Sequence, residues 1–253
     1  MKVVKNKIAS SKEWDSRAKS GYVNLEWVNS GDLLNEFLKF INPQKKDIAI
    51  DLGTGTGKVA GELAKRVRKV YGIDYSRKML NLAPKSKNIN YICADAKDLG
   101  AMGLGKADKL VARMVFHHLR ASLDKVIDYC RQILLPDGSL FLCEGISPTK
   151  RAYDNWKKIN GILEKDRVFN TKNMWIEIFK KHKFKISAMK TVAIKNLSTR
   201  NWLESRGESD ATIKKIISIR TDMSENLKKD WNARITSDDV FVDTYWFFLK
   251  ADA

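Results

Sequence analysis

The sequence predicts an α/β fold, a doubly wound, mostly parallel, seven-stranded Rossmann-like sheet with helical lid insertions. Short β-branched runs alternate with amphipathic stretches of helical spacing through the first two-thirds of the chain. Three alternate glycines, at residues 53–57, follow directly after one of the strand-like runs. A strong turn signal, Pro136-Asp137-Gly138, separates a helical stretch from the next such run. Strands that alternate with helices in this way form parallel sheets.

The elements of this region follow in order along the chain. The helix after the glycines is indicated by Val59, Leu63 and Val67, which recur at i, i+4 and i+8 and form one apolar stripe. Ser76 is a suitable N-cap for the next helix, which is expected to stop near Pro84. We expect strands over 47–52, 69–74, 90–95, 108–114 and 139–144, and helices over 58–68, from Ser76 to about Pro84, and over 122–135.

The last third of the chain has a different pattern and two long connections. The connections 146–171 and 197–238 exceed the roughly two to six residues usual between elements of a sheet. Loops past the strand ends surround the ligand crevice of an open parallel sheet, so we predict that both connections are cap insertions in a domain spanning 45–253. We also expect a helix over 175–182, a strand over 184–194, a helical stretch over 198–230 and a final strand over 240–249.

Residues 1–44 are predicted to form an N-terminal helical lid segment. Its clearest helix carries apolar residues at helical spacing, and either Ser30 or Asp32 is expected to cap it. These apolar positions are Leu33, Leu34, Phe37, Leu38 and Ile41.

The composition is that of a globular protein. Hydrophobic residues make up 43% and charged residues 30%, which excludes a disordered chain. No apolar run approaches the roughly 20 residues that span a bilayer, and the first residues lack the apolar core of a secretory signal. The three cysteines, Cys93, Cys130 and Cys143, lie far apart without a CxxC motif, as is typical of a reducing compartment. We therefore expect a soluble, cytoplasmic protein with no membrane span.

The net charge of +17 allows two interpretations. Lysine scattered over solvated faces accounts for it as a compositional bias. Alternatively, the charge serves an acidic partner such as a nucleic acid, which is possible but not favoured. The distribution is uneven, because the segment from Lys150 to Arg234 holds 21 basic and ten acidic residues, a net +11. The sequence carries no signal for the oligomeric state.

The sequence IAIDLGTGTG, residues 48–57, is the motif richest in chemical information. Glycine permits a tight turn against which a ligand can lie, and the start of the following helix offers unpaired N–H donors. A phosphate-binding P-loop would need Ser or Thr after Lys58, where Val59 stands, and a dinucleotide fingerprint would need GxGxxG rather than GxGxG. The third option is S-adenosylmethionine (SAM), whose methionine end and sulfonium would sit over such a loop.

The motif DLGTGTG resembles the first motif of class I SAM-dependent methyltransferases. Further matches follow in the order of that family: Asp74 ends the second strand, Asp95 ends the third, ARMVFHHL follows the fourth, and LPDG precedes the fifth. The resemblance covers residues 45–145 and is strongest to the small-molecule branch that contains the ubiquinone- and menaquinone-biosynthesis enzymes. It implies SAM as cofactor, with S-adenosylhomocysteine as the product.

The resemblance also implies which residues hold the cofactor. Asp51 would face its amino group, Gly53 and Gly55 would allow close backbone approach, and Asp74 would accept both ribose hydroxyls. Asp95 and the backbone of the next residue would hold the adenine. The predicted set is Tyr22, Asp51, Gly53, Thr54, Gly55, Asp74, Tyr75, Asp95, Ala96 and Arg113, with Trp14 and Arg17 as further lid candidates.

Methyl transfer from a sulfonium is an in-line SN2 reaction, in which the protein positions the nucleophile and removes water. A base helps where the acceptor has a proton to lose. His117 is predicted to face the transferred methyl after the fourth strand, and the ordinary pKa of an imidazole suits such a base; the alternative is that it only shapes the loop. Glu144, which ends the fifth strand, could orient His117, bind a substrate amine or simply end the strand. Both are candidate catalytic residues.

The acceptor pocket is expected to come from the two long connections, because aromatic walls with a few polar groups suit a small organic acceptor. We expect an enclosed cavity of a few hundred cubic ångströms. The region after the fourth strand, where a metal-dependent relative would need carboxylates, holds Arg113 and His117, and no cysteine or histidine cluster has zinc spacing, so no metal is expected. The predicted substrate contacts are His118, Trp175, Trp202 and Arg234.

The favoured function is a SAM-dependent methyltransferase that transfers a methyl group to oxygen or nitrogen of a small-molecule acceptor by in-line SN2 transfer. The alternative is an RNA or protein methyltransferase whose basic C-terminal lid binds an acidic macromolecule. A non-catalytic scaffold is disfavoured by the intact set of cofactor residues. The absence of an Asn/Asp-Pro-Pro-aromatic sequence after the fourth strand disfavours planar base or glutamine nitrogens as acceptors.

Overall fold

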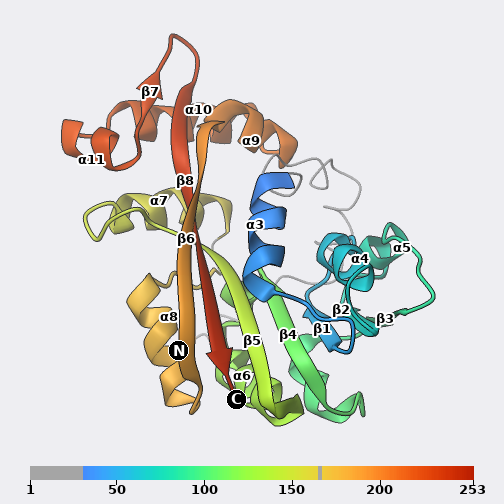
Figure 1. Cartoon of the computed structure of the whole chain (residues 1–253). Coiled ribbons are helices and arrows are strands. Elements are labelled where there is room, and N and C mark those ends of the chain that lie inside the picture. Colours follow the sequence, from blue (N-terminus) through green and yellow to red (C-terminus); the bar gives the residue numbers. More distant parts are fainter. Residues whose placement is uncertain (1–30, 165–166) are drawn as a thin grey trace, which may run out of the picture.

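The computed structural model of the chain describes residues 31–164 and 167–253 (Figure 1). One sheet runs through it in the order β3-β2-β1-β4-β5-β8-β6, with β7 paired to β8 outside this path. The first five strands are parallel, whereas β6, β7 and β5 are each antiparallel to β8. The strands are β1 (Ile48–Leu52), β2 (Lys69–Asp74), β3 (Ile89–Cys93), β4 (Ala107–Arg113), β5 (Leu134–Ile146), β6 (Lys185–Ser198), β7 (Arg234–Ile235) and β8 (Val240–Asp252).

The predicted α/β class and mostly parallel sheet are confirmed, but the described part of the chain has eight strands rather than seven. The additional strand is β7, whose two residues are too short to leave a periodic pattern. The predicted turn at Pro136-Asp137-Gly138 lies inside β5, where the pairing with β4 shifts between Ala107 and Lys109. Turns and bulges favour the same residue types, so the pattern marked a local break but not its kind.

Helices cover both faces of the sheet, and each face has its own buried cluster. On one face, α6 and α8 pack their apolar residues against the sheet; on the other, α3 and α4 do so. No helix within the described ranges is both long and apolar enough to cross a membrane. The helices that pack on the sheet are α3 (Gly31–Ile41), α4 (Lys58–Ala64), α6 (Leu123–Ile133) and α8 (Lys172–Lys181), and α5 (Arg77–Asn81) lies between β2 and β3 in the chain.

Local sequence accounts for where these helices begin and which way they face. The Ser76 hydroxyl accepts a hydrogen bond from the Met79 N–H at 3.2 Å, which confirms the predicted N-cap of α5. Helix α3 buries the predicted apolar stripe, and Asp32 lies in its first turn, where a carboxylate favours the N-terminal end of the helix dipole. Ser30, the other candidate cap, is outside the described residues.

The two long connections pack against one another. The first carries α7, and the second carries α9, α10 and α11; we call these four helices the cap. One buried cluster joins Trp156, Met223 and Trp231, and another joins Ile159 and Ile213. Figure 1 shows β6 and β8 continuing beyond the other strands to reach the last three cap helices. The cap helices are α7 (Tyr153–Leu163), α9 (Thr199–Ser205), α10 (Asp210–Thr221) and α11 (Glu225–Asp230).

Replacement of Phe37 by alanine should destabilise the whole sheet domain. The ring is fully buried under α3 and lies 4.9 Å from the ring of Phe248 on β8. We expect the free energy of unfolding, measured by urea denaturation, to fall by about 3–5 kcal/mol, the usual range for removing a buried phenylalanine ring. Asn35→Ala, on the exposed side of the same helix, should change it by less than about 0.5 kcal/mol. Equal effects of the two changes would contradict this packing.

Candidate functional site

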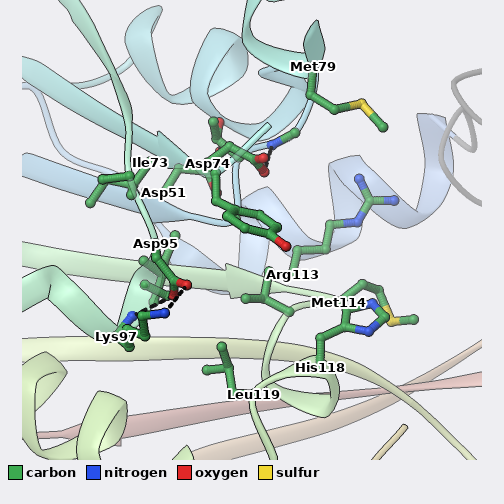
Figure 2. Close-up of a pocket in the computed structure, with 18 of the residues that line it drawn as sticks. Asp51, Ile73, Asp74, Met79, Asp95, Lys97, Arg113, Met114, His118 and Leu119 are labelled. Carbon is green, nitrogen blue, oxygen red and sulfur yellow. Dashed lines mark hydrogen bonds and ion pairs between the residues drawn. The ribbon is translucent and has the colours of Figure 1, made fainter. Parts of the chain in front are cut away.

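A cavity of about 880 Å³ opens at the carboxyl ends of the parallel strands. It lies where β1 is flanked by β2 on one side and β4 on the other, the point at which the strand order reverses and ligands of open α/β sheets bind. Its volume is within the range of about 300–1,000 Å³ typical of small-molecule sites. Figure 2 shows Asp74, Asp95 and Arg113 around this space, each at the end of a different strand.

The glycine loop after β1 presents bare main chain to the cavity. Gly53 and Gly55 have φ angles of +68° and +56°, in the region that favours glycine. A Cβ at Gly53 would lie 2.1 Å from Val115 Cγ2, so a larger residue would push apart the turns after β1 and β4. Among the described residues, a Cβ at Gly55 would meet no atom within 4 Å. Within the described part of the chain, the loop is thus packed tightly at Gly53 and leaves the backbone at Gly55 open to a ligand.

Asp51 holds this loop in position and also lines the cavity. Its Oδ2 accepts hydrogen bonds from the Thr54 hydroxyl at 2.6 Å and from the Ala60 N–H at 3.0 Å. The carboxyl is fully buried, and burial raises its pKa to about 7. The structure therefore shows Asp51 joining the loop to the start of α4, while its predicted contact with a ligand amino group remains a prediction.

Asp74 and Asp95 are each fixed by backbone donors. Asp74 accepts from the Gly55 N–H at 2.9 Å through Oδ2 and from the Ser76 N–H at 2.8 Å through Oδ1. Asp95 accepts a hydrogen bond from the Lys97 backbone N–H at 3.0 Å, and it forms an ion pair with the Lys97 Nζ, also at 3.0 Å. These bonds orient both carboxylates at the edge of the cavity, where ionised carboxylates accept hydrogen bonds from hydroxyl or amino groups.

The predicted cofactor residues converge on this cavity. Nine of the ten line it, and the tenth, Tyr22, lies outside the described residues, as do Trp14 and Arg17. Bare main chain beside fixed carboxylates fits a nucleoside with a cationic tail, which is the chemistry of SAM. Several lining residues were not predicted, among them Lys58, Met79 and Lys125, and also Met114 and Leu119, which lie in the quoted motif ARMVFHHL but were given no role.

A second cavity, of about 80 Å³, lies under the cap. It is smaller than the sequence led us to expect. Met114 borders both cavities, and its φ of +58° is a strained conformation for a residue with a long side chain. The second cavity is also lined by His117, Gly145, Ile146, Trp156, Asn160, Glu164, Arg167, Leu197, Trp202, Arg206, Arg220, Trp231, Thr244, Tyr245 and Trp246.

The two adjacent histidines face different cavities, His118 the first and His117 the second. His117 Nδ1 lies 2.7 Å from Glu144 Oε2, and the His117 N–H donates to the other oxygen at 3.3 Å. Both side chains are almost fully buried, and burial raises the pKa of Glu144 to about 7. Burial, and then the neighbouring His117, hold the pKa of His118 well below its usual range. Glu144 thus orients the His117 ring through its Nδ1 atom.

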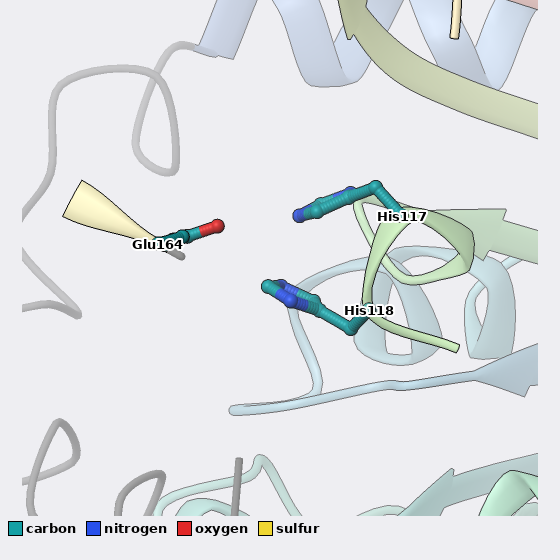
Figure 3. A group of neighbouring side chains, drawn as sticks. All are labelled: His117, His118 and Glu164. Atoms are coloured by element: carbon teal, nitrogen blue, oxygen red, sulfur yellow. The ribbon is translucent and has the colours of Figure 1, made fainter. Parts of the chain in front are cut away.

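Glu164 lies opposite the two histidines, and the three could be mistaken for a metal site. Their potential ligand atoms all lie within 4.8 Å of one another (Figure 3). However, Glu164 accepts a hydrogen bond from Arg206 at 3.1 Å and lies 3.6 Å from Arg167. Burial opposes ionisation of Glu164, but these charges outweigh it and hold its pKa well below the usual range. A metal ion there would face two guanidinium groups, so the surroundings favour an arginine-binding carboxylate, and the absence of a metal stays a prediction.

The predicted substrate contacts are divided between several places. Trp202 lines the second cavity, and His118 lines the first. Trp175 lies in the core under α8, with its ring 6.4 Å from that of Phe116, because the apolar side of this helix faces the sheet. Arg234 lies on β7, stacked 4.3 Å over the ring of Phe241. Neither cavity includes Trp175 or Arg234, so the structure gives their predicted contact with an acceptor no support.

Sequence reasoning missed the ionic lining of the second cavity. The excess of positive charge between Lys150 and Arg234 was visible, but the arginines within it were not separated from the lysines. Arginine is preferred in buried ion pairs because its planar guanidinium binds carboxylates in a fixed geometry. That distinction would have singled out the arginines of this segment. The missed residues are Glu164, Arg167, Arg206 and Arg220.

Comparisons with known proteins agree on the fold and on part of the sequence. Residues 50–142 match the family described as a methyltransferase domain. The probable S-adenosylmethionine-dependent methyltransferase CRG1 of Saccharomyces cerevisiae is 29% identical over 123 residues, which are 46% of this chain and 41% of that protein. The chain spans half or less of the length of the curated relatives it matches.

Solved structures show the same fold at low sequence identity. The BH2331 protein of Bacillus halodurans C-125 superposes with a TM-score of 0.78 at 16% identity, covering 87% of this chain and 98% of that one. A phosphoethanolamine N-methyltransferase 2 of Haemonchus contortus, in complex with phosphomonomethylethanolamine and S-adenosylhomocysteine, has a TM-score of 0.59 at 17% identity. It covers 95% of this chain, which in turn covers 58% of it. These structures show the shared fold, whereas the domain match and the curated relative support SAM as the cofactor.

Replacement of Asp74 by alanine should weaken binding of S-adenosylhomocysteine more than tenfold, which corresponds to about 1.4 kcal/mol. The change removes the acceptor expected for the ribose hydroxyls and the bond that fixes the Gly55 N–H. Titration calorimetry measures the effect. Asp98→Ala, an exposed carboxylate on the same side of the sheet that lines neither cavity, should leave the affinity unchanged. Unchanged affinity in the Asp74 variant would contradict the cofactor placement.

Proposed function

We propose that this chain, which carries a class I SAM-dependent methyltransferase domain, transfers a methyl group to an oxygen or nitrogen of a small-molecule acceptor. One observation supports this most strongly: the large cavity of the cofactor residues and the small cavity under the cap share Met114 as a border. Adjacent residues, His118 and His117, line one cavity each. A donor in the first cavity and an acceptor in the second would therefore meet in this part of the chain.

The size and position of the second cavity favour a small acceptor over RNA or protein. With about 80 Å³, it admits a compact chemical group, and it is covered by helices from both long connections. Three arginines of the strongly basic segment, Arg167, Arg206 and Arg220, are buried and so face the cavity region, whereas most of the lysines of the segment are exposed. A macromolecular enzyme would instead present such charges along an open face, where they could contact phosphates.

The pair formed by His117 and Glu144 is suited to accept the proton that an acceptor hydroxyl or ammonium group loses. SAM, when bound, supplies a methyl group on a positively charged sulfur, so no further activation of the leaving group is needed. Glu144 holds the imidazole in one orientation through the Nδ1 contact and stabilises the protonated ring once it forms. A cap that excludes water during transfer would keep both the nucleophile and the base poorly solvated.

The proposed function is tested by incubating the protein with methyl-labelled SAM and separated metabolite, RNA and protein fractions of a cell extract. Label should appear in a compound of the metabolite fraction, which mass spectrometry identifies. The Asp74→Ala variant is the matched control and should transfer little label at the same SAM concentration. Label in the RNA or protein fraction, with none in metabolites, would establish the macromolecular alternative in place of this proposal.

Glu144→Gln should slow methyl transfer by about 10²–10⁴-fold, the usual contribution of a general base. In the unchanged protein, kcat/KM should rise as the pH passes through about 7, because Glu144 ionises there and the pair becomes able to take a proton. The variant should lose this rise as well as the rate. The measurement is a pH–rate profile with the acceptor identified above.

The chain offers a matched control for this change. His182 and Asp128 form a second imidazole–carboxylate contact, 2.6 Å from Nδ1 to Oδ1, on α6 and the end of α8, away from both cavities. Asp128→Asn should leave the rate and its pH dependence unchanged. A Glu144→Gln enzyme with an unaltered profile would show that Glu144 ends the strand without a part in proton transfer.

A further inference from the structure

We propose that the second cavity recognises an anionic group, a carboxylate or a phosphate, on the molecule it binds, and that Arg167 is the residue that contacts it. The inference rests on the proposed function in one respect, which is that it identifies the bound molecule as the methyl acceptor. The binding of an anion is a separate property of the cavity, which the following features of its lining support.

Three arginines and one carboxylate, Glu164, lie in the lining of the cavity. Two carboxylates outside the lining, Glu208 and Asp239, act on Arg206 and Arg220, so Arg167 has the least compensation. All three arginines are buried, with exposed fractions of 8%, 8% and 6%. Burial lowers the pKa of Arg220 to about 10, which still leaves it charged at neutral pH. A buried charge with weak compensation is unfavourable, so an anion from outside would stabilise Arg167, which shares Glu164 with Arg206.

The cavity also contains buried hydrogen-bonding atoms without a partner. Arg167 Nε, Trp231 Nε1 and Thr244 Oγ1 are all shielded from solvent, and none has a hydrogen-bond partner among the described residues. All three can donate a proton, and two of them can only donate. An unsatisfied buried donor costs about 1–3 kcal/mol, so three around one cavity indicate a ligand rich in acceptor lone pairs. Carboxylates and phosphates are such ligands, and their bonds to arginine are charge-assisted.

Among the three arginines, Arg167 has the weakest engagement within the protein. Arg206 bonds Glu164 at 3.1 Å and Glu208 at 3.2 Å. Arg220 Nη1 donates to the Thr199 hydroxyl, and the charge of Asp239 also acts on it. Arg167 lies 3.6 Å from Glu164, beyond hydrogen-bond distance, and 5.5 Å from the ring centre of Trp156. Its Nε–H is therefore the charged donor that a ligand can take without breaking an ion pair of good geometry.

The anion would lie close to the proposed base. The Val168 N–H donates to the His117 carbonyl at 2.8 Å, which ties the residue after Arg167 directly to the histidine. The atom that receives the methyl group is then expected within a few bonds of the anionic group, or is one of its own oxygens. Apolar walls complete the cavity, and its volume of about 80 Å³ admits the anionic group with only part of an aromatic or apolar body, so the acceptor class is a small acid with such a body. These walls are formed by Trp156, Trp202, Trp231 and Trp246.

Tryptophan fluorescence can measure this binding without methyl transfer, because four of the seven tryptophans of the chain line the cavity. The probes are benzoate and phenyl phosphate, which distinguish the two anions, and benzamide, an uncharged analogue of benzoate. We expect saturable quenching by at least one of the anions and at least tenfold weaker binding of benzamide. Arg167→Gln should weaken anion binding at least tenfold, and Arg167→Lys, which keeps the charge but loses the planar fork, should fall between.

Arg151→Gln is the matched control, since Arg151 lies on the outside of the cap, paired with Asp230 and away from both cavities. It should bind the anion as the unchanged protein does. Calorimetry with S-adenosylhomocysteine verifies that each variant is folded. If Arg167→Gln does not fold, Arg167→Lys is used in its place to measure the contribution of Arg167. Equal binding of benzamide and benzoate, or full anion affinity in both Arg167 variants, would overturn the proposal. Zinc chloride that quenches the same tryptophans while both anions do not would also overturn it in favour of a metal site at His117, His118 and Glu164.

The outcomes separate this inference from the proposed function. Anion binding that depends on Arg167 in a protein that labels no metabolite would leave the anion site standing and remove the function. The opposite outcome is that all labelled metabolites are uncharged and that the charged and uncharged probes bind equally. It would support the proposed function and contradict the anion site.

Discussion

The loop after β1 is held by two carboxylates, and the rest of the site depends on that arrangement. Asp51 fixes the loop to the start of α4, and Asp74 fixes the Gly55 N–H from the neighbouring strand. Val115 packs against Gly53, and this contact requires the loop to be held in this position. That contact sets the turn after β4, in which the strained Met114 borders both cavities. Cofactor loop, cavity border and histidine pair are therefore one continuous structure.

Burial of Asp51 has an energetic consequence for this structure. A carboxyl with a pKa near 7 in the folded protein and a lower value in the unfolded chain favours folding more strongly when protonated. Its contribution is fully present below the unfolded pKa and is lost as the pH rises through about 7. The charge that forms above this pH is stabilised by the Thr54 and Ala60 donors and by the field of Arg113. A cationic ligand in the adjacent cavity would further stabilise it, so cofactor binding and loop integrity are coupled.

The sequence predicted the first cavity far better than the second, for a physical reason. Gly53, Asp74 and Asp95 follow strands that pair in parallel, so their positions relative to one another follow from local patterns and one rule of sheet topology. The second cavity depends on contacts such as Glu164 with Arg206, 42 residues apart on separate cap segments. No periodicity specifies how such helices pack. Trp175 and Trp202 show the same limit, since both lie in amphipathic helices and only tertiary packing places one in the core and the other beside a cavity.

The basic character of the chain takes on a different meaning once burial is known. Counted along the sequence, the charge between Lys150 and Arg234 suggests a surface for an acidic macromolecule. In the structure, three of its arginines are buried and line the second cavity, and one of them, Arg167, has only a weak contact with a carboxylate. Replacing such a buried ionic group by apolar residues commonly makes a protein more stable, so stability alone does not account for this arrangement. A ligand that pairs with Arg167 does account for it, and it would also stabilise the packing of the cap through mass action. The cap would then be most stable when the acceptor is bound, the state in which water must be excluded from the transferred methyl group.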